Sequence, residues 1–345
     1  MLSSVARLLA VTAVCLACAT SLARAQLVES PLDSEEAEEE GLPFRGSSFG
    51  FSQSISGNSF FKSSQLSYNP TYDWGFALDL VWHFNRTYQL ALNQEMEVEL
   101  TDSDSTTGRQ QVLLSDTMLT FDARVLNQKL SPEFSWTVHT SGTLIAPTSL
   151  ASQAATMVLG TRLGVGVAFS FPKVLGGLAI SPSLTYLHRW LQQNVAVVDE
   201  EYPCNAGSES FELCTQTGGP TNTRLSFTAK LGFELALTDK WGLSASYAHA
   251  WRRGAGLADY TYVSEDGAEV ALLDDETHWR NRSTITLGIS YYVLPWLSLG
   301  LSGSNVFTQL GPDGELRPPL KLADSTIGLD LTLLLDEIYL ATAGR

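Results

Sequence analysis

Large apolar side chains occupy every second position between Tyr72 and Phe84, and most of the positions between them are small or polar. The apolar positions are Tyr72, Trp74, Phe76, Leu78, Leu80, Trp82 and Phe84, and the positions between them are Asp73, Gly75, Ala77, Asp79, Val81 and His83. A period of two residues over this length predicts a β-strand with one apolar face and one polar face.

The same alternation recurs along the chain and predicts twelve strands. They span residues 46–56, 71–85, 87–101, 111–126, 133–147, 157–171, 178–192, 223–238, 241–253, 279–293, 296–309 and 323–336. Strands of soluble proteins typically have about five or six residues, whereas a tilted strand needs roughly 9 to 11 residues to cross a bilayer. The lengths therefore predict strands that span a membrane.

The connections between these strands alternate between short and long. The short ones are 86, 127–132, 172–177, 239–240 and 294–295, and the long ones are 57–70, 102–110, 148–156, 193–222, 254–278 and 310–322. Transmembrane barrels have short periplasmic turns and longer external loops. The pattern predicts a single antiparallel transmembrane β-barrel over residues 46–345, with both ends of its wall on the periplasmic side.

Every tryptophan lies near an end of a predicted strand. They are Trp74, Trp82, Trp136, Trp190, Trp241, Trp251, Trp279 and Trp296. Aromatic girdles of this kind mark the two levels at which a barrel wall meets the lipid headgroups. A soluble β-sandwich is the alternative, in which the same apolar faces would form a shared core, but it explains neither the tryptophans nor the alternating connections.

These features make the chain similar to the porin-like and transporter-like outer-membrane β-barrels of Gram-negative bacteria. The resemblance implies contact with outer-membrane lipids and the passage of small solutes. The segment 143–149, with the glycine-rich strand after it, is similar to barrels assigned to the uptake of small organic compounds. Such barrels commonly end in a strand with a closing aromatic residue, whereas this chain ends in residues 339–345, so Tyr339 is the candidate for that aromatic.

The first 45 residues precede the alternating region. Residues 1–25 have the pattern of a secretory signal peptide, with an apolar run at 8–17 before an Ala23-Arg24-Ala25 cleavage site; lipidation at Cys18 is the alternative. Residues 26–45 are rich in carboxylates and poor in bulky apolar side chains, which predicts a flexible acidic periplasmic tail. The tail could instead enter the lumen or bind a periplasmic partner.

Cleavage after residue 25 would leave Cys204 and Cys214 as the only cysteines, both within the connection 193–222. In an exported protein this pair predicts a disulfide bond that closes the loop. A metal site would need more ligands than this segment offers, and the histidines elsewhere lack metal-ligand spacing. We expect neither a metal nor a cofactor.

Composition excludes several classes of protein. A net charge of -16 argues against a nucleic-acid partner, which requires a basic surface, and a hydrophobic content of 44% argues against a disordered chain. No apolar run after the signal peptide approaches the roughly 18 residues of a membrane helix.

If the apolar faces contact lipid, the alternate side chains line the lumen. Many of these are small: Gly160, Gly164, Gly166, Ala168, Ser244, Ser246, Ala248, Ala250, Ser298, Gly300, Ser302 and Ser304. Eight strands make a barrel that its side chains fill, and sixteen to eighteen leave a wide channel. Twelve strands with small inner residues therefore predict a narrow passage.

Charges on the predicted inner face separate into two walls. The acidic wall comprises Asp73, Asp79, Glu95, Glu97, Asp116, Asp122 and Asp330, and the basic wall comprises Arg162, Arg189, Arg224, Lys230, Arg252, Arg280 and Arg282. Because these sets lie on opposite sides of a twelve-stranded barrel, a transverse field is expected to orient dipolar solutes.

The sequence thus predicts an outer-membrane channel or transporter for small hydrophilic or amphipathic solutes, with no enzymatic activity. A non-conducting barrel that acts as a scaffold or surface-interaction protein is the alternative, because the two walls could pair and seal the lumen. A lipid hydrolase ranks third. His139 and Ser141 have suitable spacing, but their parity points them inward, away from lipid.

Overall fold

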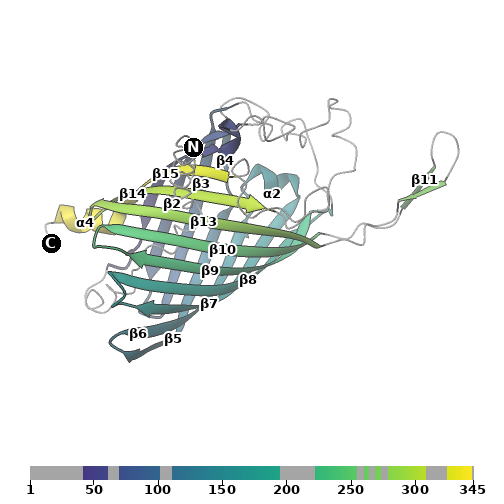
Figure 1. Ribbon diagram of the computed structural model, residues 1–345. Coiled ribbons are helices and arrows are strands. Elements are labelled where there is room, and N and C mark those ends of the chain that lie inside the picture. Colours follow the sequence, from purple (N-terminus) through teal and green to yellow (C-terminus); the bar gives the residue numbers. More distant parts are fainter. Residues whose placement is uncertain are drawn as a thin grey trace, which may run out of the picture.

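The computed structural model describes residues 42–60, 70–101, 111–194, 222–254, 260–263, 269–272, 279–307 and 325–343. In this part of the chain, twelve antiparallel strands form a closed barrel, and one short extra strand pairs at its rim (Figure 1). Each barrel strand pairs with the next one along the chain, and the first pairs with the last. The prediction of an all-β barrel of about twelve strands is confirmed.

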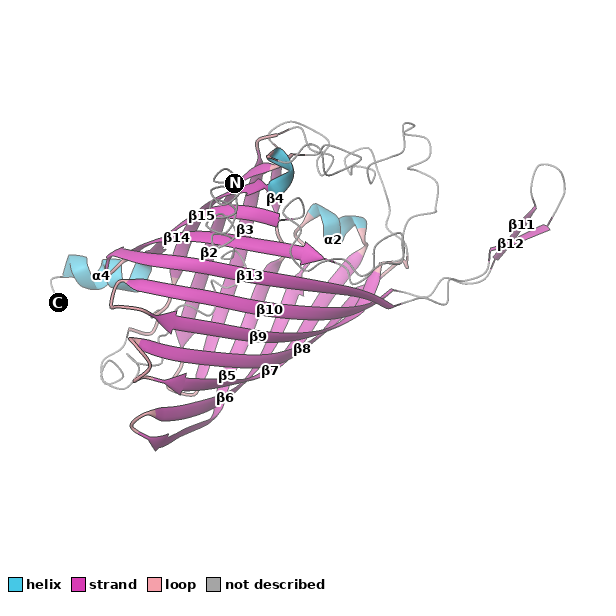
Figure 2. Cartoon of the chain, in the orientation of Figure 1, coloured by secondary structure: helices cyan, strands magenta, loops and turns pink. Residues whose placement is uncertain are grey.

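Strands account for nearly all of the regular structure (Figure 2). The barrel strands are β1 (Ser48–Ser56), β2 (Tyr72–His83), β3 (Tyr88–Glu99), β5 (Thr117–Ser131), β6 (Phe134–Ala146), β7 (Met157–Phe171), β8 (Gly177–Leu191), β9 (Thr223–Ala236), β10 (Trp241–Gly254), β13 (Trp279–Leu294), β14 (Leu297–Phe307) and β15 (Ser325–Leu334). The other elements are η3 (Gly57–Ser59), β4 (Val112–Leu114), α2 (Leu150–Ala154), the hairpin of β11 (Tyr260–Val263) with β12 (Glu269–Leu272), and α4 (Leu335–Ala343).

The apolar side chains of the alternating pattern lie on the outer wall. Leu78, Leu231 and Leu329 are 37%, 37% and 53% exposed, although each lies well inside its strand. Among the described residues the buried hydrophobic side chains are few, namely Ala77, Ala91, Ile145 and Met157. A soluble sandwich would bury its large apolar residues in a core, so this architecture excludes that alternative.

One predicted turn is wrong because a β-bulge shifts the alternation. Arg124 pairs with His139, but the next pair is Leu126 with Val138, so Val125 is an extra residue in β5. A bulge of this kind moves every following side chain to the opposite parity. The alternation therefore predicts a strand end near residue 126, whereas β5 continues to Ser131 and the turn occupies residues 132–133.

The strand predicted at 111–126 is divided into β4 and β5 by Ser115 and Asp116. Asp116 accepts hydrogen bonds from the backbone N–H of Ser149, at 3.0 Å, and from the hydroxyl of Ser152. Ser149 also caps α2, because its hydroxyl oxygen accepts from the N–H of Ser152 at 3.1 Å. The predicted loop 148–156 thus contains a short helix that Asp116 holds against the rim.

The last predicted strand, 323–336, is also too long, because β15 ends at Leu334 and α4 follows it directly. Tyr339 therefore lies on a helix and not on a closing strand, where its ring packs edge-on against Phe44 at 5.6 Å. Residues 42–45, the described part of the predicted tail, form a turn against β2, and the carbonyl of Pro43 accepts from the N–H of His83 at 2.6 Å. No helix in the described ranges has the length and apolar character needed to cross a bilayer.

Short turns join the strands at one end of the barrel, where α4 also lies (Figure 1). They comprise residues 84–87, 132–133, 172–176, 237–240 and 295–296. The strand ends that lead into the longer connections lie at the opposite end, with α2 on that rim (Figure 1). In outer-membrane barrels the end with short turns faces the periplasm.

Close packing between β6 and β7 leads to a stability prediction. A Cβ at Gly160 would lie 2.9 Å from the Cβ of Ile145, which is only 5% exposed and has little room to move. We expect Gly160→Ala to lower the free energy of unfolding by about 1 kcal/mol, at the lower end of the range for overpacking. Urea unfolding in lipid vesicles, followed by tryptophan fluorescence, measures this. Gly142→Ala is the control, because no heavy atom lies within 4 Å of its new Cβ; equal losses in both variants would contradict the prediction.

Candidate functional site

The lumen is lined by every second residue of each strand, and the register shows which residues share its surface. Residues paired across neighbouring strands point to the same side of the sheet. Ser54 of β1 pairs with Asp73 of β2 and with Gly328 of β15, which in turn pairs with Ser302 of β14. This row continues around the inside of the barrel and consists of small, hydroxyl-bearing and charged residues.

A cavity of about 620 Å³, lined by both polar and apolar groups, opens from this inner surface in the half of the barrel opposite the short turns. Three groups of side chains dominate its wall, in the order in which the strands follow one another. The guanidinium side comprises Arg252 and Arg282; the hydroxyl band comprises Ser52, Ser54, Thr284, Thr286, Ser302, Ser304 and Thr326; the carboxylate side comprises Asp73, Glu95 and Glu97. Asp330 lies within the hydroxyl band, where its carboxylate accepts from the hydroxyl of Ser302 at 2.9 Å.

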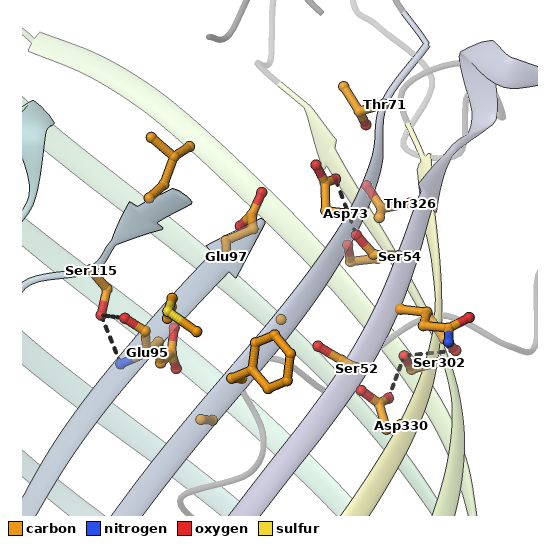
Figure 3. A pocket seen from close by; sticks show the side chains of 18 of the residues that line it. Ser52, Ser54, Thr71, Asp73, Glu95, Glu97, Ser115, Ser302, Thr326 and Asp330 are labelled. Atoms are coloured by element: carbon orange, nitrogen blue, oxygen red, sulfur yellow. Dashed lines mark hydrogen bonds between the residues drawn. The ribbon is translucent and has the colours of Figure 1, made fainter. Parts of the chain in front are cut away.

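The carboxylate side is formed by β2 and β3 (Figure 3). Asp73 accepts from the hydroxyl of Ser54 at 3.3 Å, and Glu97 projects from the neighbouring strand. The residue directly opposite Glu97 is Gly75, so no side chain separates Glu97 from the hydroxyl band at this level. A Cβ at Gly75 would overlap the hydroxyl of Ser52, so the recess depends on glycine at this position.

The remaining acidic residues of the predicted wall lie outside the cavity lining. Asp79 accepts from Asn93 at 2.5 Å and from Ser48 at 3.4 Å, so it joins three strands near the short-turn half. Asp116 accepts hydrogen bonds from Ser149 and Ser152 at the start of α2. Asp122 pairs with Ser141 of β6 on the inner face, deeper along the barrel.

The guanidinium side contains like charges on neighbouring strands. Arg252 of β10 pairs directly with Arg280 of β13, and Arg282 follows at the next inward position. Neither Arg252 nor Arg282 makes an ion pair within 4 Å with a carboxylate in the described part of the chain. Like charges placed opposite each other across a strand pair are destabilising, so an anion at this position would be stabilising.

The other predicted basic residues continue the inner surface on β7, β8 and β9 but do not line the cavity. Arg162 pairs with Leu187, and Arg189 pairs with Gly160 and donates to the carbonyl of Thr223 at 3.5 Å. Arg224 is exposed near the start of β9. Lys230, further along β9, pairs with Ser183 and Ala248.

His139 and Ser141, the pair considered for hydrolase chemistry, both face the lumen. His139 pairs with Arg124 and Gly166, and Ser141 pairs with Asp122 and Gly164. Each side chain lies over a different glycine of β7, where an added Cβ would overlap it. A membrane lipid on the outer wall has no access to this pair, and no hydrogen bond joins the two side chains in the described structure.

A repeated outward motif was not recognised from the sequence. Residues 186–190 and 247–251 both read Tyr-x-His-x-Trp, on β8 and β10, and the histidine and tryptophan rings lie 4.5 Å apart in each copy. His249 also hydrogen-bonds Ser283 through Nδ1 at 2.8 Å, but Ser283 is only 1% exposed and so cannot meet a substrate. The identical Tyr-x-His-x-Trp spacing in the two segments was the sequence signal that could have identified these neighbouring rings, which extend the aromatic girdle.

Among the residues that the structure describes, no group of three or more His, Cys, Asp or Glu side chains could hold a metal ion. The proposed disulfide between Cys204 and Cys214 lies outside the described residues, as do the predicted signal peptide and residues 26–41 of the tail. These three remain predictions.

Comparison with known proteins bears on the fold. No family model and no curated protein matches the sequence. Among solved structures, an outer-membrane channel from Pseudomonas putida F1 matches with a TM-score of 0.50 and 11% identity, over 88% of this chain and 99% of that chain. The NanC porin matches with a TM-score of 0.41 and 10% identity, over 84% and 100% of the two chains. The KdgM porin, in complex with disordered oligogalacturonate, matches with a TM-score of 0.38 and 7% identity, over 83% and 98%.

The likeness to the Pseudomonas channel extends over nearly the whole of both chains and concerns the architecture of the wall. In this protein that wall is a closed cylinder with large apolar side chains outside and polar side chains inside. Closed cylinders of this kind leave no unpaired strand edge in the hydrocarbon region. The chain therefore has the fold of a bacterial outer-membrane β-barrel of the porin-like type.

Proposed function

We propose that this protein is an outer-membrane channel or transporter through which small hydrophilic or amphipathic solutes pass. The observation that carries the proposal is the cavity of about 620 Å³ inside the barrel, which the described side chains do not fill. Its size lies within the range of small-molecule sites, and its wall offers donors, acceptors and charges of both signs. The solved barrels with related architecture include proteins described as channels and porins.

Passage through this lumen would depend on the charges that line it. A narrow route surrounded by protein screens charge weakly, so each guanidinium or carboxylate raises or lowers the local concentration of ions. Small inner residues such as Ser304 and Gly328 keep the wall thin at the level of the cavity. The outer-membrane lipids would contact only the apolar outer wall.

Planar-bilayer conductance of the purified protein tests the proposal. We expect discrete conductance steps, and we expect Arg252→Gln and Arg282→Gln each to shift the reversal potential in a salt gradient toward cation selectivity, because each removes a positive charge from the lumen. Arg253→Gln is the matched control, since Arg253 is the next residue on β10, is exposed and pairs with Trp279 on the outer face. A shift of the same size in the control would contradict a lumenal role for these arginines.

A non-conducting barrel is the second candidate, favoured by one observation. The half of the lumen nearer the short turns carries opposite charges, among them Asp122, Arg124, Lys230 and Glu234 on the inner face. Pairing of such charges across the lumen would seal it. If neither the full chain nor a variant lacking residues 26–41 conducts, the scaffold or surface-interaction role replaces the channel.

A further inference from the structure

The cavity has opposite charges on its two sides, and this arrangement constrains the solute. On one side, Arg252 and Arg282 present guanidinium groups without a carboxylate within ion-pair distance in the described ranges. On the other side, Asp73 and Glu97 present neighbouring carboxyl groups from adjacent strands, next to the recess at Gly75. Each side is therefore a region of repulsion between like charges that a ligand group of opposite sign would relieve.

The hydroxyl band joins these two sides. It begins on β13, the strand of Arg282, and runs across β14, β15 and β1, the three strands that lie between the arginines and the carboxylates. Serine and threonine hydroxyls donate and accept hydrogen bonds, so they suit a ligand whose body carries hydroxyl groups. Val306 adds one apolar side chain beside the band, whereas Gly328 and Asp330 are small or polar, so this part of the wall offers mainly hydrogen-bonding groups.

We propose that this cavity is a selective binding site for small zwitterions whose two charged groups lie at opposite ends of a hydroxyl-bearing body, such as sugar acids with a terminal amino group. The carboxylate or other anionic group of the solute binds between Arg252 and Arg282. Its ammonium group binds between Asp73 and Glu97, and its hydroxyl groups contact the band between them. This inference rests on the proposed function and adds to it the chemical class of the preferred solute.

A solute with one charge would satisfy only one side. A carboxylate alone would neutralise the arginines but leave the repulsion between Asp73 and Glu97, and an amine alone would do the reverse. Charge-assisted hydrogen bonds are stronger than neutral ones, so the two ends contribute more than the hydroxyl contacts. The zwitterion should therefore bind more tightly than the anion, the cation and the neutral polyol of the same length.

Four straight-chain six-carbon polyols supply a matched set of probes. They are 6-amino-6-deoxygluconate as the zwitterion, gluconate as the anion, glucamine as the cation and sorbitol as the neutral compound. Block of the single-channel ion current in planar bilayers gives the half-blocking concentration of each. We expect this concentration for the zwitterion to be lower by about tenfold or more than for either singly charged probe, the change expected from one added charge-assisted contact.

Substitutions identify which side recognises which group. In Arg252→Gln/Arg282→Gln the zwitterion should lose its advantage over glucamine, and in Asp73→Asn/Glu97→Gln it should lose its advantage over gluconate. Arg253→Gln and Asp239→Asn, at the outer face of β10 and in the turn before it, remove the same charges outside the cavity and should preserve both advantages. Each of these substitutions replaces a charged side chain with a neutral polar one of similar or smaller size, so we expect the variants to fold. The conductance of each variant is checked before the block is measured.

The outcomes separate this inference from the proposed function. Absence of conductance in the unsubstituted protein would overturn the channel itself. Conductance with equal block by all four probes, or with gluconate as effective as the zwitterion, would overturn only the zwitterion site. Loss of the advantage in Arg253→Gln as well as in the cavity variants would likewise contradict it.

Discussion

Replacement of Leu231 by arginine is expected to lower the free energy of unfolding of the membrane-inserted barrel by about 2 to 4 kcal/mol, the range measured for arginine on the lipid face near the bilayer midplane. Leu231 lies in the interior of β9, between Pro182 of β8 and Tyr247 of β10, and its side chain is 37% exposed on the outer wall. In hydrocarbon, the guanidinium would lose its hydration without gaining a partner. Urea unfolding in lipid vesicles, followed by tryptophan fluorescence, measures the change.

Thr228→Arg is the matched control for Leu231→Arg. Thr228 lies three residues away on the same strand, but it pairs with Thr185 and Ala250 on the inner face. An arginine there would remain in contact with the polar lumen, so we expect a loss below about 1 kcal/mol, as for substitutions at solvated sites. Equal losses in the two variants would mean that the outer and inner faces had been wrongly assigned.

The number and length of the strands could be predicted from the sequence because the period of two is a local property. In β2, β9 and β10 large apolar side chains recur at every second position, mostly with small or polar residues between them, so the outer face is determined by neighbouring residues alone. The boundaries of β7, Met157–Phe171, coincide with the predicted segment 157–171. The shape of the barrel follows once such strands must bury their backbone groups in lipid.

The errors arose where a non-local contact overrides the local pattern. Nothing in residues 120–130 identifies Val125 as the extra residue of β5, because the bulge is defined by pairing with β6. Asp116 interrupts its strand because its carboxylate binds α2, which lies more than thirty residues further along the chain. Leu335 begins a helix although apolar residues precede it, because α4 packs against the turn before β1.

Only part of the candidate site could be predicted from the sequence. Parity could assign a side chain to the lumen, but its height along the barrel depends on the register between strands, which the sequence alone does not determine. Asp73 and Asp79 have the same parity on β2, yet Asp73 lines the cavity whereas Asp79 binds Asn93. The direct pairing of Arg252 with Arg280 likewise appears only once β10 and β13 are aligned.

The second prediction with a large expected effect on stability concerns the seam of the barrel, where the first strand, β1, pairs with the last strand, β15. Asp336, in the first turn of α4, is 6% exposed, and its Oδ2 accepts a hydrogen bond from the backbone N–H of Gly46 at 3.0 Å. Gly46 has φ = 81°, a conformation that favours glycine, and it leads directly into β1. The N–H of Leu335 donates to the carbonyl of Ser47 at 2.9 Å, so the end of β15 and the entry to β1 are joined just outside the last pair of the seam.

We expect Asp336→Ala to lower the free energy of unfolding by about 1 to 3 kcal/mol, because the buried N–H of Gly46 would lose its acceptor. A carboxylate in the first turn also stabilises a helix, so α4 itself should be weakened. Urea unfolding in vesicles measures the loss, and the rate of folding into detergent micelles measures closure of the barrel. Asp336→Asn keeps an acceptor oxygen and should lose less than Asp336→Ala.

Thr342→Ala is the control within the same helix. Thr342 is exposed, and its hydroxyl donates only to carbonyls of its own helix, those of Ile338 at 2.9 Å and Tyr339 at 3.0 Å, among the described contacts. Its loss should stay within about 0.5 kcal/mol, as for most surface substitutions. If Asp336→Ala unfolds at the same urea concentration as Thr342→Ala, the contact with Gly46 does not hold the seam, and closure depends on the pairing of β1 with β15 alone.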